Sequence, residues 1–459
     1  MIQKDLIIIG AGPGGYETAV KAAHRGLDTL IVEAQDLGGT CLNCGCIPTK
    51  SLCKNAQVLN DLREGERWGL QQLAYQFDLK QAVARKDEVV ATLRSGIQTL
   101  LSAPRITLVR GRARLTDSRT VVVDGAKDAE GQPLADGEFT APHIIIATGS
   151  ESKSLPIPGA NLSGVLTSTE MLNLDYIPHR LTIIGGGVIG MEFASIFAAF
   201  GSQVTVLEFC KEMLPNFEAD LVKRMRPAFK KAGIDLVNQA AVTAIEERGG
   251  VLTVNYELKG KPTAIEADLV LMAVGRTPRT ENLGLEAAGV DFDKRGISVD
   301  DNMLTSQLGI YAIGDVNGRC LLAHAASFQG LRALNHITQT PDNISLDLMP
   351  AAIFTTPEAA SVGPTEAQCK EAGLETKVYK GFFRTNGKAL AMGESEGMVK
   401  LIADADDRLL AGHIFGPHAA DIVHELVPMI ASGYTVQQLR ETIHAHPTLS
   451  EVILGAAGH

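Results

Sequence analysis

The sequence predicts an α/β protein with two Rossmann-like dinucleotide-binding domains and a third, C-terminal α+β domain. Three observations lead to this prediction. The chain has 459 residues, too many for one hydrophobic core, so about three domains are expected. A glycine-rich segment near the start occurs again later in the chain. From about Met349 the pattern changes to alternating strands and late helices without such a segment.

The repeat aligns without a gap when the sequence is shifted by 175 residues. Each copy contains an apolar strand, a glycine turn, a helix, a second strand and an acidic residue. The two strands are residues 6–9 and 29–32 in the first copy, and residues 181–184 and 204–207 in the second. The coinciding positions are Gly10 with Gly185, Gly12 with Gly187, Gly15 with Gly190, and Glu33 with Glu208.

This order of parts is what a dinucleotide site needs. The first glycine allows a tight turn, the second lets the backbone approach a pyrophosphate, and the third lets the helix pack on the strand. The helix N-terminus offers N–H groups and a positive dipole end to the phosphates. The acid, 23 residues after the first glycine, accepts hydrogen bonds from a ribose diol. The sequence therefore predicts two dinucleotide sites.

The acid of the second copy indicates which dinucleotide binds there. Glu208 would repel a 2′-phosphate, and residues 209–211 contain no arginine pair that could bind one. The second site is therefore predicted to bind NAD rather than NADP. Lys211 is the one nearby residue that favours NADP.

Three further apolar strands end in small or acidic residues. They run into Thr148 and Gly149, into Gly275, and into Gly314 and Asp315. The first two strand ends are predicted to be the places where the chain passes from one nucleotide domain to the next. The predicted divisions are a first dinucleotide domain at 1–149, the second at 150–276, a return to the first at 277–348, and the last domain at 349–459.

A cluster of cysteines follows the second strand of the first copy. Cys41 and Cys46 are five residues apart and can form a disulfide if the turn between them brings their Cα atoms within about 7 Å. Pro48 suits a first helical turn, which places Cys46 at a helix N-terminus, where the dipole favours a thiolate. Lys50 lies one helical turn further, on the same face.

Cys44, between these two cysteines, has two interpretations. It is either a small buried hydrophobe, as many cysteines are, or a third thiol that exchanges with Cys41. The remaining cysteines are interpreted as structural; they are Cys53, Cys210, Cys320 and Cys369.

Near the end of the chain, His444 and His446 precede Glu451. No metal is predicted here, because no second ligand cluster accompanies the two histidines. A dithiol substrate is mostly protonated at neutral pH, and it attacks a disulfide only as a thiolate. A histidine oriented by a carboxylate is a suitable base for that proton. Two structural histidines on a loop are the alternative.

Composition and charge exclude some partners. Lys and Arg number 42 against 53 Asp and Glu, a net charge of −11, which argues against nucleic acid or an anionic membrane as main partner. No apolar run of about 18 residues is present, and the first residues lack the features of a secretory leader. Seven cysteines, an odd number, do not fit an extracellular disulfide framework. A cytoplasmic location is expected.

The segment from Cys41 to Lys50 resembles the redox-disulfide motif of the pyridine nucleotide–disulfide oxidoreductase family, and residues 444–451 resemble its C-terminal motif. The resemblance covers essentially the whole chain. It implies a homodimer that binds FAD in the first site and NAD in the second, with residues 349–459 as the dimerisation domain. Cys44 departs from the family, which usually has a small apolar residue there.

The resemblance also implies a role for each site residue. Cys41 would meet the substrate, and Cys46 would lie beside the flavin. His446, with Glu451 as its partner, would be the base and would act in the other subunit's site. Lys50 would lie near the flavin, paired with Glu192. The residues expected to bind FAD are Gly10, Gly12, Gly15, Glu33, Lys50, Thr148, Gly149, Asp315 and Ala323. Those expected to bind NAD are Gly185, Gly187, Gly190, Glu208 and Gly275.

Within the family, the motifs are most similar to those of the dihydrolipoamide dehydrogenases. This implies oxidation of protein-bound dihydrolipoamide to lipoamide with reduction of NAD. The implied partners are lipoyl domains of an acyltransferase core or a glycine-cleavage carrier protein. Mercuric reductases would carry a C-terminal cysteine pair, but no cysteine follows Cys369, and glutathione reductases take NADPH, against Glu208. A reductase of these kinds, or a mainly structural docking subunit, is the alternative.

Overall fold

The computed structural model describes residues 2–135 and 137–458 of the chain. The chain folds into two compact units, each assembled from three separate segments. The first unit contains Met1–Ser51, Val83–Lys153 and Gly275–Leu346, and the second contains Leu52–Ala82, Ser154–Val274 and Asp347–His459.

The first unit is built on an eight-stranded sheet with the order β1-β6-β5-β4-β3-β2-β7-β20. The neighbouring strands β4, β3, β2, β7 and β20 run parallel to one another, and β5 is antiparallel to β4 and β6. Apolar runs such as residues 6–9 suit central parallel strands, which are buried on both faces. The strands are β1 (Ile2–Gln3), β2 (Leu6–Ile9), β3 (Thr29–Glu33), β4 (Ile106–Leu115), β5 (Thr120–Lys127), β6 (Glu138–Thr140), β7 (His143–Ile146) and β20 (Ile310–Ala312).

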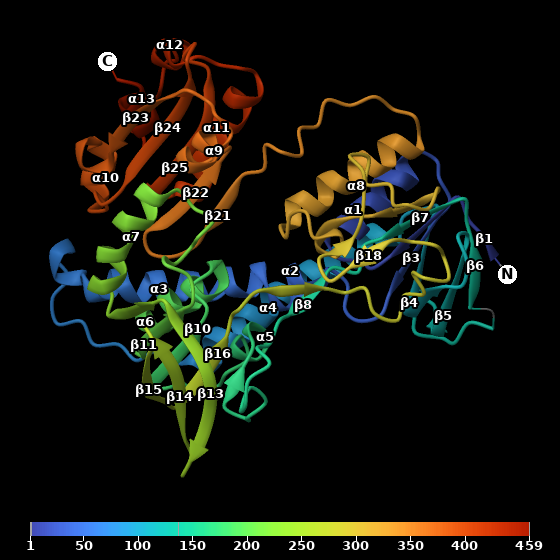
Figure 1. Cartoon of the computed structure of the whole chain (residues 1–459), viewed down its shortest axis with the longest axis horizontal. Helices are drawn as coiled ribbons and strands as arrows, with labels where there is room; N and C mark the ends of the chain where they lie inside the picture. The colour runs from blue at the N-terminus through green and yellow to red at the C-terminus, as the bar shows by residue number, and fades with distance from the viewer. Residues whose placement is uncertain (1, 136, 459) are drawn as a thin grey trace. The chain divides into compact units, whose positions relative to one another are not determined.

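Alternate side chains of β2 enter two different cores, as the period of a strand requires. Leu6 and Ile8 belong to the core shared with the helices α1 (Pro13–His24), α4 (Leu79–Leu101) and α8 (Ala323–Ile337). Ile7 and Ile9 belong to a second core on the opposite face. Helices α1 and α8 lie side by side (Figure 1). A Cβ atom at Gly14 of α1 would lie only 3.0 Å from the Cβ of Ala326, so glycine permits this close packing.

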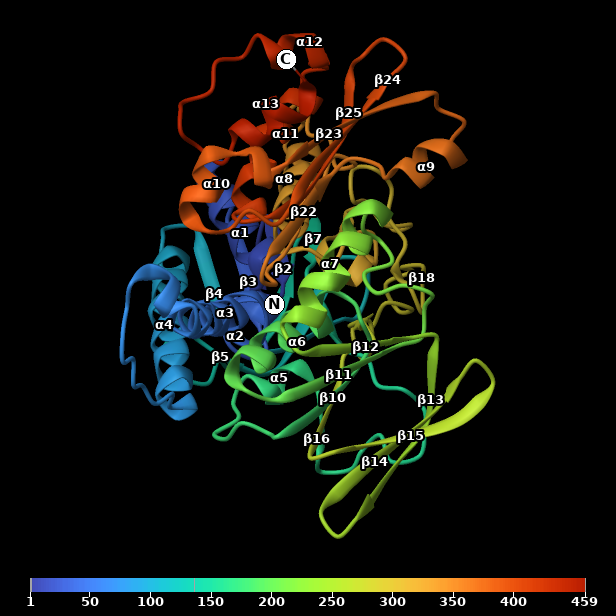
Figure 2. The same ribbon diagram turned by 90° about the vertical axis from the view of Figure 1, so that its left-hand side faces the viewer.

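The second unit contains a parallel five-stranded sheet with the order β12-β11-β10-β16-β9. An antiparallel ribbon of three strands, β13 to β15, extends beyond it (Figure 2). The strands are β9 (Val165–Leu166), β10 (Arg180–Ile184), β11 (Gln203–Glu208), β12 (Ile234–Asn238), β13 (Ala240–Arg248), β14 (Val251–Leu258), β15 (Lys261–Ala267) and β16 (Leu269–Met272). The helices of this part are α5 (Ser168–Met171), α6 (Val188–Phe200) and α7 (Ala219–Lys231).

The C-terminal part of the second unit is an antiparallel sheet with the order β21-β22-β25-β24-β23. Its strands are β21 (Ala351–Ile353), β22 (Glu358–Val362), β23 (Thr376–Phe382), β24 (Met398–Asp404) and β25 (Leu409–Gly416). Its helices are α9 (Glu366–Glu371), α10 (Gly387–Met392), α11 (Ala419–Ala431), α12 (Val436–Arg440) and α13 (Glu451–Ala457). Two sheets with parallel strands of the dinucleotide-binding type and one α+β part are therefore present, and the predicted fold class is confirmed.

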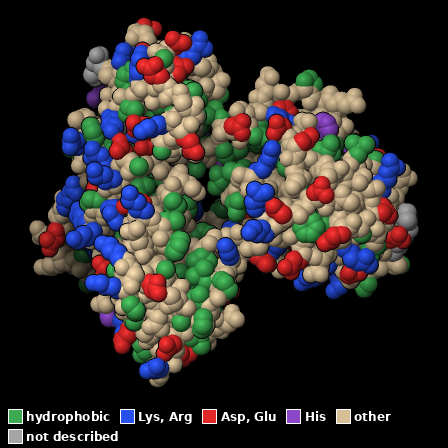
Figure 3. Space-filling view, viewed as in Figure 1, with side chains coloured by type: hydrophobic (Ala, Val, Ile, Leu, Met, Phe, Trp, Pro, Cys, Tyr) green, Lys and Arg blue, Asp and Glu red, His purple; other side chains and the backbone are tan. Residues whose placement is uncertain are grey.

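Short elements complete the chain. In the first unit, β8 (Ser150–Ser152) pairs antiparallel with β17 (Arg276–Pro278), and β18 (Phe292–Asp293) with β19 (Gly296–Ile297). Single 3-10 turns lie at η1 (Gly65–Trp68), η2 (Gly314–Asn317) and η3 (Phe383–Thr385). Within residues 2–135 and 137–458, no helix is long and apolar enough to cross a membrane. Both signs of charge are interspersed on the surface in Figure 3, and basic side chains gather over α7.

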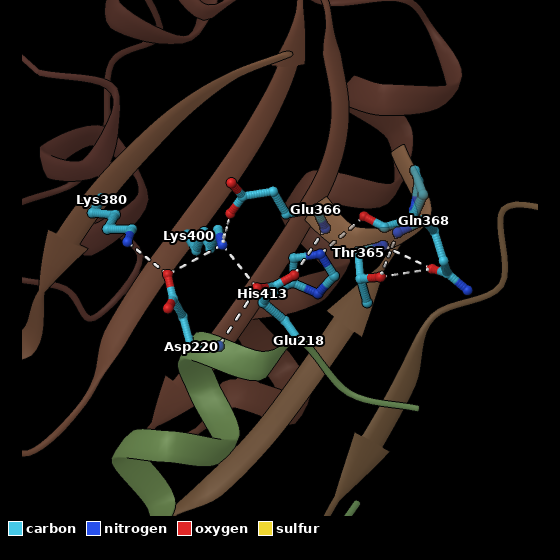
Figure 4. Close-up of polar contacts among 9 residues, drawn as sticks. Glu218, Asp220, Thr365, Glu366, Gln368, Lys380, Lys400 and His413 are labelled. Carbon is cyan, nitrogen blue, oxygen red and sulfur yellow. Dashed lines mark hydrogen bonds and ion pairs between the residues drawn. The ribbon is translucent and has the colours of Figure 1, made fainter. Parts of the chain in front are cut away.

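A buried ion network fastens α7 to the C-terminal sheet (Figure 4). Lys400 of β24 is 0% exposed. Its ammonium group contacts Glu218 at 2.8 Å, Asp220 at 3.1 Å and the carboxylate of Glu366. Glu218 also caps the N-terminus of α7 and accepts a hydrogen bond from the backbone N–H of Glu366 at 2.9 Å. The three carboxylates lie close enough to hold a cation, and the ammonium group of Lys400 lies among them.

The network shifts the pKa values of Glu218, Asp220 and Lys400. Burial is the largest effect on the pKa of Glu218 and would raise it, but the hydrogen bonds from Lys400 and from the backbone N–H of Glu366, together with the positive charge of Lys400, outweigh burial and lower this pKa. The hydrogen bond from Lys380 is the main cause of the lowered pKa of Asp220. Burial alone would lower the pKa of Lys400, but its carboxylate partners hold it above the ordinary value. The three groups therefore stay charged over a wider pH range than free side chains.

We expect Lys400→Met to lower the free energy of unfolding of the second unit by about 3–5 kcal/mol, because it leaves a buried carboxylate without its counter-ion. Urea denaturation of the purified protein measures this. Lys380→Met is the matched control: Lys380 also binds Asp220, at 2.6 Å, but its side chain is 41% exposed. Its loss should cost less than about 1 kcal/mol. Equal losses in the two variants would contradict a dominant role for Lys400.

The lowered pKa values also predict a pH profile. The carboxylates contribute stability that is present above their unfolded pKa values, about 4, and is lost as pH falls through the lowered folded values. Lys400 contributes stability that is present below its unfolded pKa and lost as pH rises through its raised value. The stability gap between the wild type and Lys400→Met should therefore be constant near neutral pH and shrink below about pH 4. A gap that widens on acidification would contradict the assigned charges.

Candidate active site

The first glycine turn joins β2 to α1. Gly10 has φ 106°, a left-handed conformation that other residues rarely adopt. A Cβ atom at Gly15 would overlap the carbonyl oxygen of Gly10, so only glycine lets α1 begin this close to the strand. Glu33, at the end of β3, accepts a hydrogen bond at 2.7 Å from the backbone N–H of Ala11 inside the turn. The carboxylate of Glu33 is therefore hydrogen-bonded to the turn itself.

The second glycine turn, between β10 and α6, has the same contacts. Gly185 has φ 108°, and a Cβ atom at Gly190 would overlap its carbonyl oxygen. Glu208, at the end of β11, accepts hydrogen bonds from the backbone N–H groups of Gly186 at 2.5 Å and of Cys210 at 2.6 Å. The acid of each repeat thus binds the residue that follows the first glycine.

Both turns present backbone donors in the way that a pyrophosphate requires. In the described part of the chain, no side chain caps the N-terminus of α1 or α6, so their first N–H groups point outward. A Cβ atom at Gly187 would meet no described atom within 4 Å, which leaves room for a ligand against the backbone. These features fit the phosphates of a dinucleotide at each turn.

The other predicted residues of the first site lie around the same sheet edge. Thr148 and Gly149 follow β7, and the hydroxyl of Thr148 donates to the carbonyl of Arg279 at 2.8 Å. Asp315, in η2, accepts a hydrogen bond from the hydroxyl of Ser150. Ala323 is the first residue of α8, which has no side-chain cap among the described residues. The carboxyl ends of neighbouring parallel strands are where ligands of such sheets bind.

The predicted cysteines lie on two successive helices, the short α2 (Gly39–Cys44) and the longer α3 (Cys46–Arg63). Gly38 begins this segment with φ 95°, and its N–H binds the carbonyl of Ala11 at 2.8 Å. A Cβ atom at Gly39 would lie 2.7 Å from the Cα of Gly12. The cysteine helix is therefore fastened directly to the first glycine turn.

Asn43 holds α2 in place. Its amide donates to the carbonyls of Leu37 and Gly39, both at 2.9 Å. Its oxygen accepts from the guanidinium of Arg94 on α4 at 2.7 and 3.1 Å. Nothing in the spacing of the sequence indicates Arg94, which lies 51 residues away.

The two predicted redox thiols contact each other. The thiol of Cys41 hydrogen-bonds to Cys46, and this bond is the main cause of a raised pKa of Cys41, with burial second. The positive charge of Lys50 opposes both effects on the pKa of Cys41. Cys41 thus keeps its proton while it donates to Cys46, which begins α3 at the positive end of the helix dipole.

The predicted base is paired with its acid. Nδ1 of His446 lies 2.9 Å from a carboxylate oxygen of Glu451, the first residue of α13. The backbone N–H of Thr448 is the main cause of a lowered pKa of Glu451, and His446 lowers it further. A carboxylate can only accept, so Nδ1 carries the proton and Nε2 presents its lone pair. The side chain of His446 is 77% exposed, so Nε2 is accessible to a substrate.

A second histidine–carboxylate pair supports this loop. Nε2 of His444 lies 2.5 Å from Glu425 on α11, and Nδ1 lies 2.9 Å from the carbonyl of Thr442. The side chain of His444 is 5% exposed. One histidine is therefore buried and anchored, and the other is exposed. The sequence contains no signal for Glu425, because it lies on α11, 19 residues before its partner in the loop.

The two units carry separate parts of the predicted site. The cysteines, Lys50 and the first glycine turn belong to the first unit, whereas Glu192, His446 and the second glycine turn belong to the second. Glu192 is buried in α6 and accepts a hydrogen bond from the backbone N–H of Phe354 at 3.0 Å. The pairing of Lys50 with Glu192 stays a prediction. Gly275, predicted to contact NAD, falls in the first unit.

Comparison with known proteins establishes the family. Residues 4–330 match the model described as pyridine nucleotide-disulphide oxidoreductase, and residues 349–457 match its dimerisation domain. The chain belongs to the pyridine nucleotide-disulphide oxidoreductase family. The predicted family is thereby confirmed.

Curated relatives and solved structures match this chain over nearly its full length. A dihydrolipoyl dehydrogenase of Chlamydia muridarum is 41% identical over 98% of this chain and 95% of its own. One of Geobacillus stearothermophilus is 38% identical over 99% of this chain and 96% of its own. The structure of the HOCl-induced flavoprotein disulfide reductase RclA from Escherichia coli, a Cu(II) complex, has a TM-score of 0.88 and 30% identity, covering 100% of this chain and 99% of its own.

Membership settles the class of chemistry. The chain is an enzyme, an oxidoreductase of the flavoprotein disulfide reductase class, and its cofactors are FAD and NAD. The two glycine turns, each with uncapped N–H groups and an acid, fit two dinucleotides. The dimerisation domain supports a homodimer.

The second turn predicts dinucleotide specificity. Replacing Glu208 with Ala removes a charged acceptor for a ribose diol, a loss of about 1.5–3 kcal/mol. We expect the KM for NAD to rise about 10- to 100-fold and the preference over NADP to fall by a similar factor. Steady-state kinetics with both nucleotides measures this. Lys211→Ala, which alters an exposed neighbour, should leave the KM for NAD unchanged. An unaltered NAD/NADP ratio in Glu208→Ala would refute the assignment.

Proposed function

We propose that the protein is a dihydrolipoamide dehydrogenase: it oxidises protein-bound dihydrolipoamide to lipoamide and reduces NAD to NADH. The observation that carries this proposal is the contact between the thiols of Cys41 and Cys46, beside the first glycine turn. Relatives named dihydrolipoyl dehydrogenase, at 38% and 41% identity over nearly the whole chain, support the choice of substrate.

The proposed cofactor contacts follow the two turns. FAD would be held by Gly10, Gly12, Gly15, Glu33, Lys50, Thr148, Gly149, Asp315 and Ala323. NAD would be held by Gly185, Gly187, Gly190, Glu208 and Gly275. Bound there, FAD would supply two-electron transfer between the thiols and NAD. The chain holds the thiols and both dinucleotides, and Lys50 with Glu192 would place a fixed charge pair beside the flavin.

The residues of the chain divide the thiol chemistry between them. Nε2 of His446 of the partner subunit would take the proton of a substrate thiol, while Glu451 holds the imidazole in the tautomer that leaves Nε2 free to accept. The substrate thiolate would attack Sγ of Cys41 in the oxidised Cys41–Cys46 pair, and Cys46 would leave as a thiolate. The second substrate thiol would then displace Cys41 and release lipoamide.

The partners would be lipoyl domains of an acyltransferase core or of a glycine-cleavage carrier protein. We also propose the division into domains at residues 1–149, 150–276, 277–348 and 349–459, and a cytoplasmic location, which the odd number of cysteines favours.

A second candidate is a reductase of another disulfide. The likeness to RclA, a flavoprotein disulfide reductase that is induced by HOCl, favours it. A docking subunit with a structural flavin would not need the contacting thiols or the His446–Glu451 pair.

An assay of NAD reduction by dihydrolipoamide tests the proposal. NADP, and oxidised glutathione with NADPH, are the parallel substrates. Rapid, NAD-specific turnover that Cys41→Ser abolishes is the expected result, while binding to a lipoyl-bearing core should persist in this variant. A yellow protein without dihydrolipoamide activity would instead indicate that the substrate is another disulfide.

We expect His446→Gln to lower kcat with dihydrolipoamide about 10²- to 10⁴-fold, because the base that accepts the thiol proton is gone. Reduction of an artificial dye by NADH, which bypasses the dithiol, should be unchanged. His424→Gln, at an exposed position of α11, is the matched control and should keep both activities. Full dithiol turnover in His446→Gln would overturn the assignment of the base.

A further inference from the structure

Cys44 is the one thiol of the redox segment that the proposed function does not use. It is the last residue of α2, and Cys41 is the third. The two therefore form a Cys-x-x-Cys pair within a single helix, inside the longer Cys41–Cys46 spacing. All three cysteines are half-buried.

The helix brings Cys41 and Cys44 within disulfide range. Three residues of α-helix separate two Cα atoms by about 5 Å, inside the range of about 4.4–6.8 Å found in disulfides. Their Cβ atoms, about 5–6 Å apart in a regular helix, must approach by about 1–2 Å to reach disulfide spacing. Closing this pair therefore needs a small movement at the end of α2.

Such a movement would fall at the last residue of α2. Cys44 is followed by Gly45, which leaves the helix with φ −141° and ψ −111°. The residues between the two cysteines are anchored: Leu42 is buried, and Asn43 hydrogen-bonds to Asp36, Leu37, Gly39 and Arg94. A shift of Cys44 therefore does not require Leu42 or Asn43 to leave their contacts.

We propose that Cys44 is a second resolving thiol for Cys41, so that the oxidised enzyme interconverts between two disulfide isomers. This inference rests on the proposed Cys41–Cys46 disulfide. The thiolate of Cys44, its proton having passed to water, attacks Sγ of Cys41. The Cys41–Cys44 bond forms, the Cys41–Cys46 bond breaks, and Cys46 leaves as a thiolate. No electrons are gained or lost, because one disulfide and one thiol are present before and after.

The position of Cys46 favours this exchange. A thiol leaves faster when its thiolate is stabilised, and Cys46 begins α3, a helix of 18 residues, at the positive end of its dipole. The second isomer separates the substrate thiol Cys41 from Cys46. It therefore disconnects dithiol oxidation from the flavin until the exchange reverses.

Peptide mapping distinguishes the two isomers. The three cysteines share one tryptic peptide, because residues 26–50 contain no Lys or Arg before Lys50. The oxidised holoenzyme would be acid-quenched, alkylated with N-ethylmaleimide and digested, and the label located by tandem mass spectrometry. The Cys41–Cys46 isomer carries the label on Cys44, and the Cys41–Cys44 isomer carries it on Cys46. A fraction labelled on Cys46 is expected, and label on Cys44 alone would overturn the proposal.

A pair of variants tests the proposed Cys41–Cys44 disulfide without requiring the enzyme to oxidise dihydrolipoamide. Cys46→Ser leaves only Cys41 and Cys44 in the segment, whereas Cys44→Val combined with Cys46→Ser leaves only Cys41. After treatment with diamide, which accepts two electrons, and titration of thiols in denaturant, the single variant should lose two more thiols than the double variant. Equal losses would overturn the proposal. Because neither variant needs to turn over dihydrolipoamide, failure here is distinct from failure of the proposed activity.

Discussion

The structure depends on a close approach between a strand and the helix that follows it, made twice. In each repeat the helix passes so near the turn that a Cβ atom at Gly15 or Gly190 would overlap the carbonyl of Gly10 or Gly185. This proximity leaves the first helical N–H groups facing outward and brings an acid from the next strand onto the turn. In the first unit it also provides Ala11 and Gly12, against which the cysteine helix rests. The redox segment is therefore placed by the same turn that shapes the dinucleotide site.

Local patterns in the sequence predict much of this site, because the chemistry depends on short spacings. The partners in the Cys41–Cys46 contact and in the His446–Glu451 pair are only five residues apart in the sequence. The glycine turns and their acids belong to a motif that occurs twice. These contacts are present in the structure. The roles assigned to the residues stay predictions, as do those that depend on both units, such as the pairing of Lys50 with Glu192.

The partners that the sequence does not reveal are separated by long stretches of chain. Arg94 reaches Asn43 from another helix, and Glu425 reaches His444 in the same way. In the sequence Lys400 lies within the otherwise apolar run of residues 398–403, and nothing there indicates its partners, yet it is fully buried. In each case a polar side chain needs a partner because burial removes it from water, and only the tertiary fold decides which partner that is. Such contacts follow from packing and not from any periodicity.

The double role of the acid in each turn has a consequence for redesigning the enzyme. Besides its proposed contact with a ribose, Glu208 accepts backbone hydrogen bonds from Gly186 and Cys210. An engineer who removes it to admit a different coenzyme also loosens the loop that positions the coenzyme's phosphates. A safer route keeps the carboxylate and adds positive charge next to it, at Phe209, whose side chain is 76% exposed. Coenzyme choice in this scaffold is thus coupled to loop rigidity, and the two must be optimised together.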